Sequence, residues 1–160
     1  VHFALTPAQE KKLLSAAKKD DADLVMEIIE EIEEDWDEEF CFESDKSWDA
    51  MHRCLSNGTL NVTEGDYPLK MAVFGGRQMP SEEDYFVVYI DSKQVKDVAA
   101  ALSKVDLKWL TERYWKMSDD YQCEKDDMDL QYTWENLQKM QKFFECVATT
   151  QRSVIFTVDQ

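Results

Sequence analysis

One apolar stripe recurs at helical spacing in the first third of the chain. It repeats every four residues and consists of Leu24, Ile28, Ile32 and Trp36. Acidic side chains fill most of the positions between these residues. This pattern is typical of an amphipathic helix, and it places Trp36 on the inner face and the carboxylates on the outer face.

Similar periodicity predicts further helices, which begin after Thr6, near Asp45, after Asp91, after Asp106 and near Leu130. Three segments instead have the β-branched and aromatic content of strands, namely Val1–Leu5, Tyr85–Ile90 and Ser153–Val158. Because helices and strands do not alternate regularly, the expected fold class is α+β. We expect a small mixed sheet with strands from both termini and the middle, covered by about five to six helices. No linker divides the chain, so residues 1–160 are predicted to form one domain.

The chain is strongly acidic, with 18 Lys and Arg against 34 Asp and Glu and a net charge of −16. Such a surface repels phosphate groups, so direct binding to nucleic acid or to an anionic membrane is not expected. It suits a basic protein as partner. The candidate docking residues on the outer helix face are Glu27, Glu30, Glu31 and Glu34. A simpler interpretation, in which the acidity only aids solubility, fits the same charge.

A second candidate site lies on the helix predicted near Asp45. Trp48 and His52 are four residues apart and project from one face, and Asp49 precedes His52 by three residues. These three side chains could line a ligand pocket in which His52 acts as a base or ligand. The competing interpretation is structural, with a buried His52 that packs beside Met51 and Trp48.

The usual catalytic and cofactor motifs are missing from the sequence. It has no Gly-x-Ser-x-Gly elbow, and Gly75-Gly76 lacks the frame of a phosphate-binding loop. The acidic stretch Ser118–Asp129 lacks the spacing of a calcium loop. No catalytic residue, metal site or cofactor is therefore predicted, and the balance favours a protein without enzymatic activity.

The cysteines and the apolar content bear on location. The cysteines are Cys41, Cys54, Cys123 and Cys146, and no two form a Cys-x-x-Cys pair. The sequence shows no signal peptide and no apolar run near the roughly 20 residues of a membrane span. We therefore expect free thiols and a cytoplasmic location.

Several motifs occur in a fixed order along the chain. They are Asp45–Leu55 with a following glycine turn, Tyr67–Gly76, the Val95–Tyr114 helix pair, Tyr132–Glu135 and the terminal strand Val154–Phe156. As a set, they resemble the YfbM-like family, a bacterial domain of unknown function, over nearly the whole chain. The resemblance implies a small α+β fold and no particular activity. The chain departs from that pattern in its acidic second helix and in Ser118–Asp129.

Together these observations predict a non-enzymatic interaction or regulatory module that binds a basic protein. One alternative is an inhibitor or immunity protein for a basic toxin or a nucleic-acid enzyme. Another is an enzyme or small-ligand binder with a pocket around Trp48, Asp49 and His52. No oligomeric state is predicted.

Overall fold

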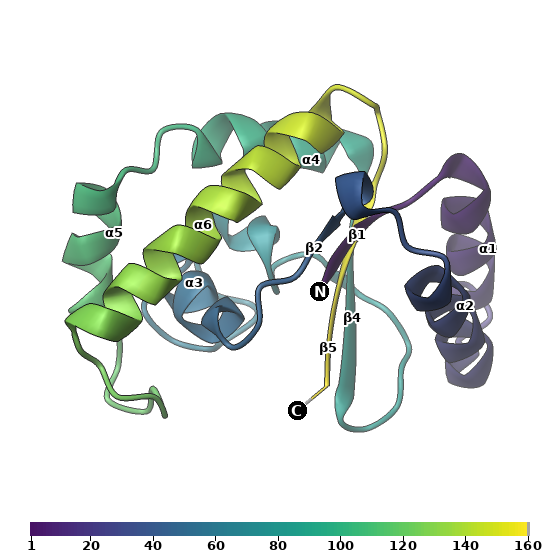
Figure 1. The fold of residues 1–160 in the computed structure, drawn as a ribbon. Coiled ribbons are helices and arrows are strands. Elements are labelled where there is room, and N and C mark those ends of the chain that lie inside the picture. Colours follow the sequence, from purple (N-terminus) through teal and green to yellow (C-terminus); the bar gives the residue numbers. More distant parts are fainter. Residues whose placement is uncertain (160) are drawn as a thin grey trace.

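Five strands form one sheet that lies between two layers of helices (Figure 1). The computed structural model describes residues 1–159. The strands are β1 His2–Ala4, β2 Cys41–Phe42, β3 Arg77–Gln78, β4 Tyr85–Ile90 and β5 Val154–Asp159. The α-helices are α1 Pro7–Ala17, α2 Ala22–Glu34, α3 Ser47–Leu55, α4 Ser92–Leu102, α5 Leu107–Tyr114 and α6 Asp127–Ala148. Two 3-10 helices are η1 Glu38–Phe40 and η2 Leu69–Ala72. These elements confirm the predicted α+β class.

The sheet has the order β2-β1-β5-β4-β3, with strands from both termini side by side near its centre. The sheet was expected to be mixed, but each described pair of neighbours is antiparallel. The reason is that β1 and β4 run in the same direction while β5 lies between them and runs opposite to both. The sequence did not predict β2 and β3, because strands of two residues are too short to show alternation.

Alternating side chains of the central strands divide the core into two parts. Phe3 and Ile155 belong to the part packed against α1 and α2. Ala4 and Phe156 belong to the part that contains residues of α3, α4, α5 and α6. The two helical layers are therefore held to the sheet independently, and burial of each large side chain stabilises the fold by about 1.5–3 kcal/mol.

Side chains cap the starts of most helices. Thr6, Asp21, Asp91, Asp106 and Asp126 accept backbone N–H bonds at α1, α2, α4, α5 and α6. Each cap contributes about 1 kcal/mol. The sequence predicts that the last helix begins near Leu130. With Asp126 as its cap, α6 instead begins at Asp127, three residues earlier. By contrast, α3 begins after Lys46, which makes no side-chain cap bond.

The end of α2 differs from the sequence prediction. The helix stops at Glu34, and Asp35 has non-helical angles, with φ of −113° and ψ of 45°. Trp36 is 55% exposed instead of lying on the inner face. A strict four-residue repeat rotates by about 40° per step around a helix, so three steps from Leu24 carry the position of Trp36 about 120° away. The indole therefore lies at the surface, beside the end of the helix.

Candidate functional site: an acidic groove around Trp36

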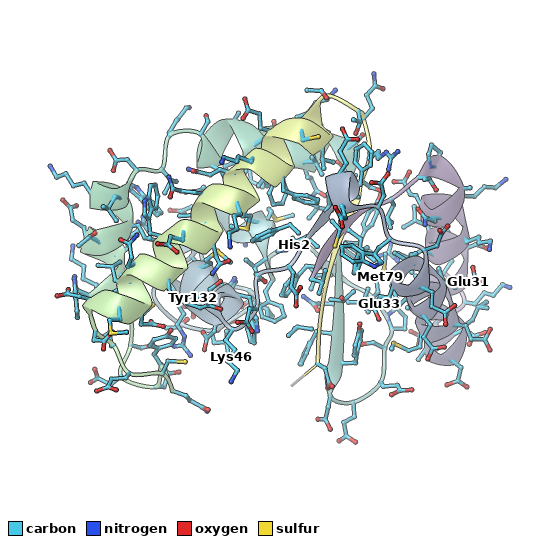
Figure 2. The ribbon with its side chains drawn as sticks, viewed as in Figure 1. His2, Glu31, Glu33, Lys46, Met79 and Tyr132 are labelled. Carbon is cyan, nitrogen blue, oxygen red and sulfur yellow. The ribbon has the colours of Figure 1, made fainter. Side chains whose placement is uncertain are left out.

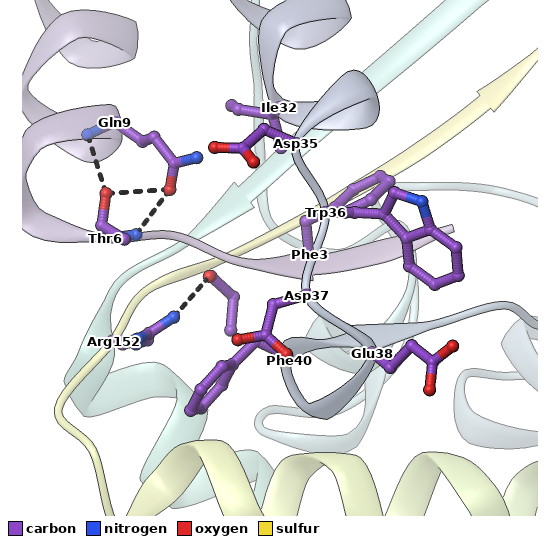
Figure 3. Close-up of a pocket in the computed structure, with 11 residues that line it drawn as sticks. Phe3, Thr6, Gln9, Ile32, Asp35, Trp36, Asp37, Glu38, Phe40 and Arg152 are labelled. Carbon is purple, nitrogen blue, oxygen red and sulfur yellow. Dashed lines mark hydrogen bonds between the residues drawn. The ribbon is translucent and has the colours of Figure 1, made fainter.

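A surface groove lies where the end of α2, β1 and the segment before β5 meet (Figure 3). Its volume is about 620 Å³. Figure 3 shows the Trp36 indole and Glu38 on one side of this groove, and Thr6 and Arg152 on the opposite side. The groove is thus built from segments that are far apart in the sequence, and the sheet brings them together.

Apolar side chains form the inner lining of the groove. Phe3 and Ile32 are 6% and 3% exposed, so they present an apolar surface that the core fixes in place. Phe40 is half-buried, and the guanidinium of Arg152 lies over its ring at 3.6 Å from the centroid. Arg152 also donates a hydrogen bond from Nη1 to the carbonyl oxygen of Ala4 at 3.4 Å.

Three carboxylates line the groove, those of Asp35, Asp37 and Glu38. All three residues are exposed, and none forms an ion pair within residues 1–159. Asp37 accepts one hydrogen bond at Oδ1, from the backbone N–H of Glu39 at 3.0 Å. Arg152 is the one cation on the described lining, so the groove carries an excess of negative charge that attracts cations.

A smaller hollow adjoins the groove, and Trp36 and Phe3 line both. Its volume is about 270 Å³, and it contains the carboxylates of Glu33 and Glu43. Tyr85 holds Glu33 in place by donating from its hydroxyl to Oε1 at 2.6 Å. Trp36 therefore belongs to two adjoining hollows, each with its own carboxylates.

The predicted docking face lies on α2. Its residues, Glu27, Glu30, Glu31 and Glu34, are exposed and occupy helix positions i, i+3, i+4 and i+7. Glu31 pairs with Lys12 of α1 at 2.9 Å, but both side chains are more than half exposed, so the pair is weak. Figure 2 shows Glu31 and Glu33 on the α2 side of the sheet. The last residue of this face, Glu34, is followed by Asp35, which lines the groove, so the negative surface of α2 leads into the groove.

The neighbourhood of His52 is packed. His52 has no exposed surface, and its ring meets the ring of Phe74 edge-on, with the centroids 5.3 Å apart. Trp48 is half-buried and meets Phe74 in the same way, at 5.3 Å. Neither ring nitrogen of His52 has a hydrogen-bond partner among the described residues. Burial lowers the pKa of His52 to about 4, and the backbone of Asn61 offsets part of this lowering. His52 is therefore uncharged at neutral pH.

Asp49 bonds to Arg53 in the same helix. Nε of Arg53 donates to Oδ1 of Asp49 at 2.5 Å, and its Nη1 donates to Asp120 at 2.8 Å. Arg53 is 2% exposed. Burial raises the pKa of Asp49, and the bond from Arg53 opposes that rise. The structure thus places Trp48 and His52 against the same Phe74 ring and ties Asp49 into an ion-pair network.

The cysteine thiols of both regions are poorly suited to act as nucleophiles. Cys41 lines the smaller hollow, and burial raises the pKa of its thiol to about 11. Burial also raises the pKa of Cys54 in α3, to about 12. Both thiols stay protonated at neutral pH, which disfavours nucleophilic chemistry.

Within the described residues, no three His, Cys, Asp or Glu side chains are grouped to hold a metal ion. None of the helices from α1 to α6 is long and apolar enough to cross a bilayer.

Sequence reasoning missed Trp36 as a site residue. The sequence does contain a signal for its exposure, since four charged residues surround it, namely Asp35, Asp37, Glu38 and Glu39. Charged side chains on both sides of an aromatic residue disfavour a buried position, because an unpaired buried charge is costly. This signal competes with the four-residue apolar repeat, and in the structure the local charges prevail.

The fold and the groove together define an acidic α+β domain with an open surface site. Residues 1–157 match the family described as domain of unknown function DUF1877, and the chain belongs to this family. The structure is similar to the crystal structure of YfbM from Escherichia coli, a protein of unknown function. The TM-score is 0.69, the match covers 99% of this chain and 98% of that chain, and the sequences are 14% identical. These findings confirm the resemblance drawn from the motifs, and the likeness to YfbM concerns the fold alone. No curated protein matches the chain.

Proposed function

We propose that this protein is a non-enzymatic interaction module that binds a basic protein segment along α2 and in the groove around Trp36. The observation that carries the proposal is the 55% exposed indole of Trp36, beside carboxylates that form no ion pair in the described chain. An exposed tryptophan in a hollow is a typical anchor of a protein interface. Unpaired carboxylates around it attract a basic partner and select against an acidic one.

The shape of the acidic surface supports a segment rather than a single cation as the ligand. The glutamates of the α2 face follow one side of the helix and lead to Asp35 at the edge of the groove. A basic segment that lies along α2 can therefore contact the whole face and still reach Trp36. An inhibitor of a basic toxin or nucleic-acid enzyme would use this same surface.

The other features fit a binding role in the cytoplasm. All four cysteines are free, which supports a reducing compartment. A pocket around Trp48, Asp49 and His52 is not part of the proposal, because His52 has no exposed surface and Asp49 is bonded to Arg53.

The test separates the position of the charges from their number. In one variant, the four glutamates of the α2 face, Glu27, Glu30, Glu31 and Glu34, are changed to Gln. In the matched control, four exposed glutamates elsewhere, Glu82, Glu83, Glu124 and Glu145, are changed to Gln. Each variant has a net charge of −16 + 4 = −12. Binding of a short, unstructured peptide rich in Arg and Lys is measured by calorimetry at an ionic strength of about 0.15 M.

We expect the α2 variant to bind about tenfold more weakly than the wild type, because four exposed charge contacts of a few tenths of a kcal/mol each are lost. The control variant should bind within about twofold of the wild type. Equal weakening of both variants would mean that only the net charge matters, and the proposed docking face would then be rejected.

A further inference from the structure

Three aromatic side chains are strongly exposed, those of Trp36, Tyr67 and Trp115, and Trp36 is the one that lies among the carboxylates of the two hollows. Trp115, which is 44% exposed, has the ring of Tyr114 against it at 5.2 Å. Trp36 has neither a ring nor a guanidinium stacked on it among residues 1–159, although it is 55% exposed. Its indole is therefore free to take a ligand on its face.

Aromatic rings of this chain accept guanidinium groups as well as other rings. Three guanidinium groups lie over rings within the protein: Arg53 over Tyr121 at 5.6 Å, Arg113 over Trp109 at 4.3 Å and Arg152 over Phe40 at 3.6 Å. The last of these pairs lies in the groove itself. The groove thus already holds one guanidinium on an aromatic ring, and Trp36 offers a second ring nearby (Figure 3).

The charges around Trp36 favour a cation on that ring. Asp35, Asp37 and Glu38 line one hollow, and Glu33 and Glu43 line the other. A cation over an indole face is attracted by the ring, and carboxylates beside it add charge-assisted hydrogen bonds. Arginine suits this combination better than lysine, because its planar, weakly hydrated guanidinium can stack and bond to a carboxylate at the same time.

We infer that Trp36 anchors an arginine side chain of the basic partner segment, with the guanidinium stacked on the indole between the carboxylates of the two hollows. This inference rests on the proposed function, because it names the chemistry at the same groove. The occupant is a protein segment and not a free cation, because the α2 face extends the negative surface well beyond the reach of one free cation.

The test uses two peptides that differ only in having arginine or lysine at each basic position. Their binding is measured by calorimetry to the full chain and to Trp36→Leu, Trp36→Phe and Trp115→Leu. Trp36→Leu removes the aromatic face and Trp36→Phe keeps a smaller one, while Trp115→Leu removes an exposed tryptophan outside the groove. Circular dichroism confirms the fold of each variant, and Trp36→Phe serves as the mildest change if Trp36→Leu unfolds.

We expect Trp36→Leu to weaken the arginine peptide about tenfold and the lysine peptide about twofold. Trp36→Phe should lie between the wild type and Trp36→Leu for the arginine peptide, and Trp115→Leu should match the wild type. Wild-type affinity of Trp36→Leu for the arginine peptide would overturn the inference. So would equal losses for the two peptides, because these would show a contact without preference for a guanidinium.

Two further outcomes identify which idea fails. If the α2 glutamine variant binds weakly but Trp36→Leu binds as the wild type does, the docking face stands and the arginine anchor is rejected. If neither variant differs from its matched control, both proposals are rejected. Size-exclusion chromatography without peptide completes the set, since a dimer that Trp36→Leu dissociates would show that a second copy of the chain occupies the groove and would overturn the inference.

Discussion

Two tryptophans that each lie beside an aspartate end in opposite environments. Trp36 is 55% exposed, and its neighbours Asp35 and Asp37 make no ion pair in the described chain. Trp48 is half-buried against Phe74, and its neighbour Asp49 is bonded to a buried arginine at 2.5 Å. The same pair of residue types therefore serves the fold in one region and remains available to a partner in the other.

A single side chain explains much of this difference. Arg53 reaches Asp49 in its own helix and Asp120 in the segment before α6, so it joins two parts of the chain. No arginine or lysine reaches Asp35, Asp37 or Glu38 in this way among the described residues. A buried carboxylate needs a partner within the fold, whereas an exposed one can keep its charge for another molecule.

The largest expected effect comes from removing Arg53. Arg53→Ala leaves Asp49 partly buried without its cation, and we expect a loss of about 3 kcal/mol in the free energy of unfolding. Lys12→Ala breaks the exposed pair with Glu31 and is the control, with an expected change below about 0.5 kcal/mol. Urea unfolding followed by circular dichroism measures both. An unchanged urea midpoint for Arg53→Ala would remove the distinction between the two regions.

The next effect is a loss of stability at low pH, and it comes from His52 in α3. Burial lowers the pKa of His52 from its ordinary 6.5 to about 4, so the unfolded chain takes up this proton first as the pH falls. Stability from this group is therefore unchanged above about pH 7 and is lost as the pH drops from 6.5 towards 4, by about 2–3 kcal/mol at pH 4.5.

His52→Leu, which cannot be protonated there, isolates that contribution. Urea unfolding of the wild type and of His52→Leu is compared at pH 7 and at lower pH. We expect the variant to lose less stability than the wild type over this range. Parallel losses would show that His52 is not the group responsible.

A smaller effect separates the two tryptophans directly. Trp48→Ala removes a half-buried ring that packs against Phe74 and Phe156, and we expect a loss of about 2 kcal/mol. Trp36→Ala removes an exposed ring and should change stability by less than about 0.5 kcal/mol. Thermal unfolding of both variants ranks them, and a larger loss for Trp36→Ala would mean that Trp36 supports the fold after all.

Much of the fold could be predicted from local patterns. Side chains that cap helices, such as Thr6, Asp91 and Asp106, act within one turn of chain, so the sequence reveals them. The strand Tyr85–Ile90 was predicted with the bounds observed, because β-branched and aromatic residues fill it. The antiparallel order of the sheet depends on how α6 returns the chain to place β5 between β1 and β4, and no local pattern contains that information.

The candidate sites were harder to predict for the same reason. The glutamates of the α2 face follow helical periodicity, so their shared exposure was predictable. Trp36 was placed inside, because its repeat was extended beyond the last residue of the helix, Glu34. The contact of Arg53 with Asp120 spans 67 residues, and the groove joins α2 to Arg152 near the other end of the chain. Such long-range neighbours become visible only in the folded chain.

One NMR measurement compares the two regions in a single spectrum. The five tryptophans each give an indole N–H signal, and the variants Trp36→Phe and Trp48→Phe assign the two that matter. The arginine peptide is then added to the wild-type protein. We predict that the Trp36 signal shifts with peptide concentration while the Trp48 signal stays in place. A shift of Trp48 with an unmoved Trp36 would contradict this account and place the binding site beside His52 instead.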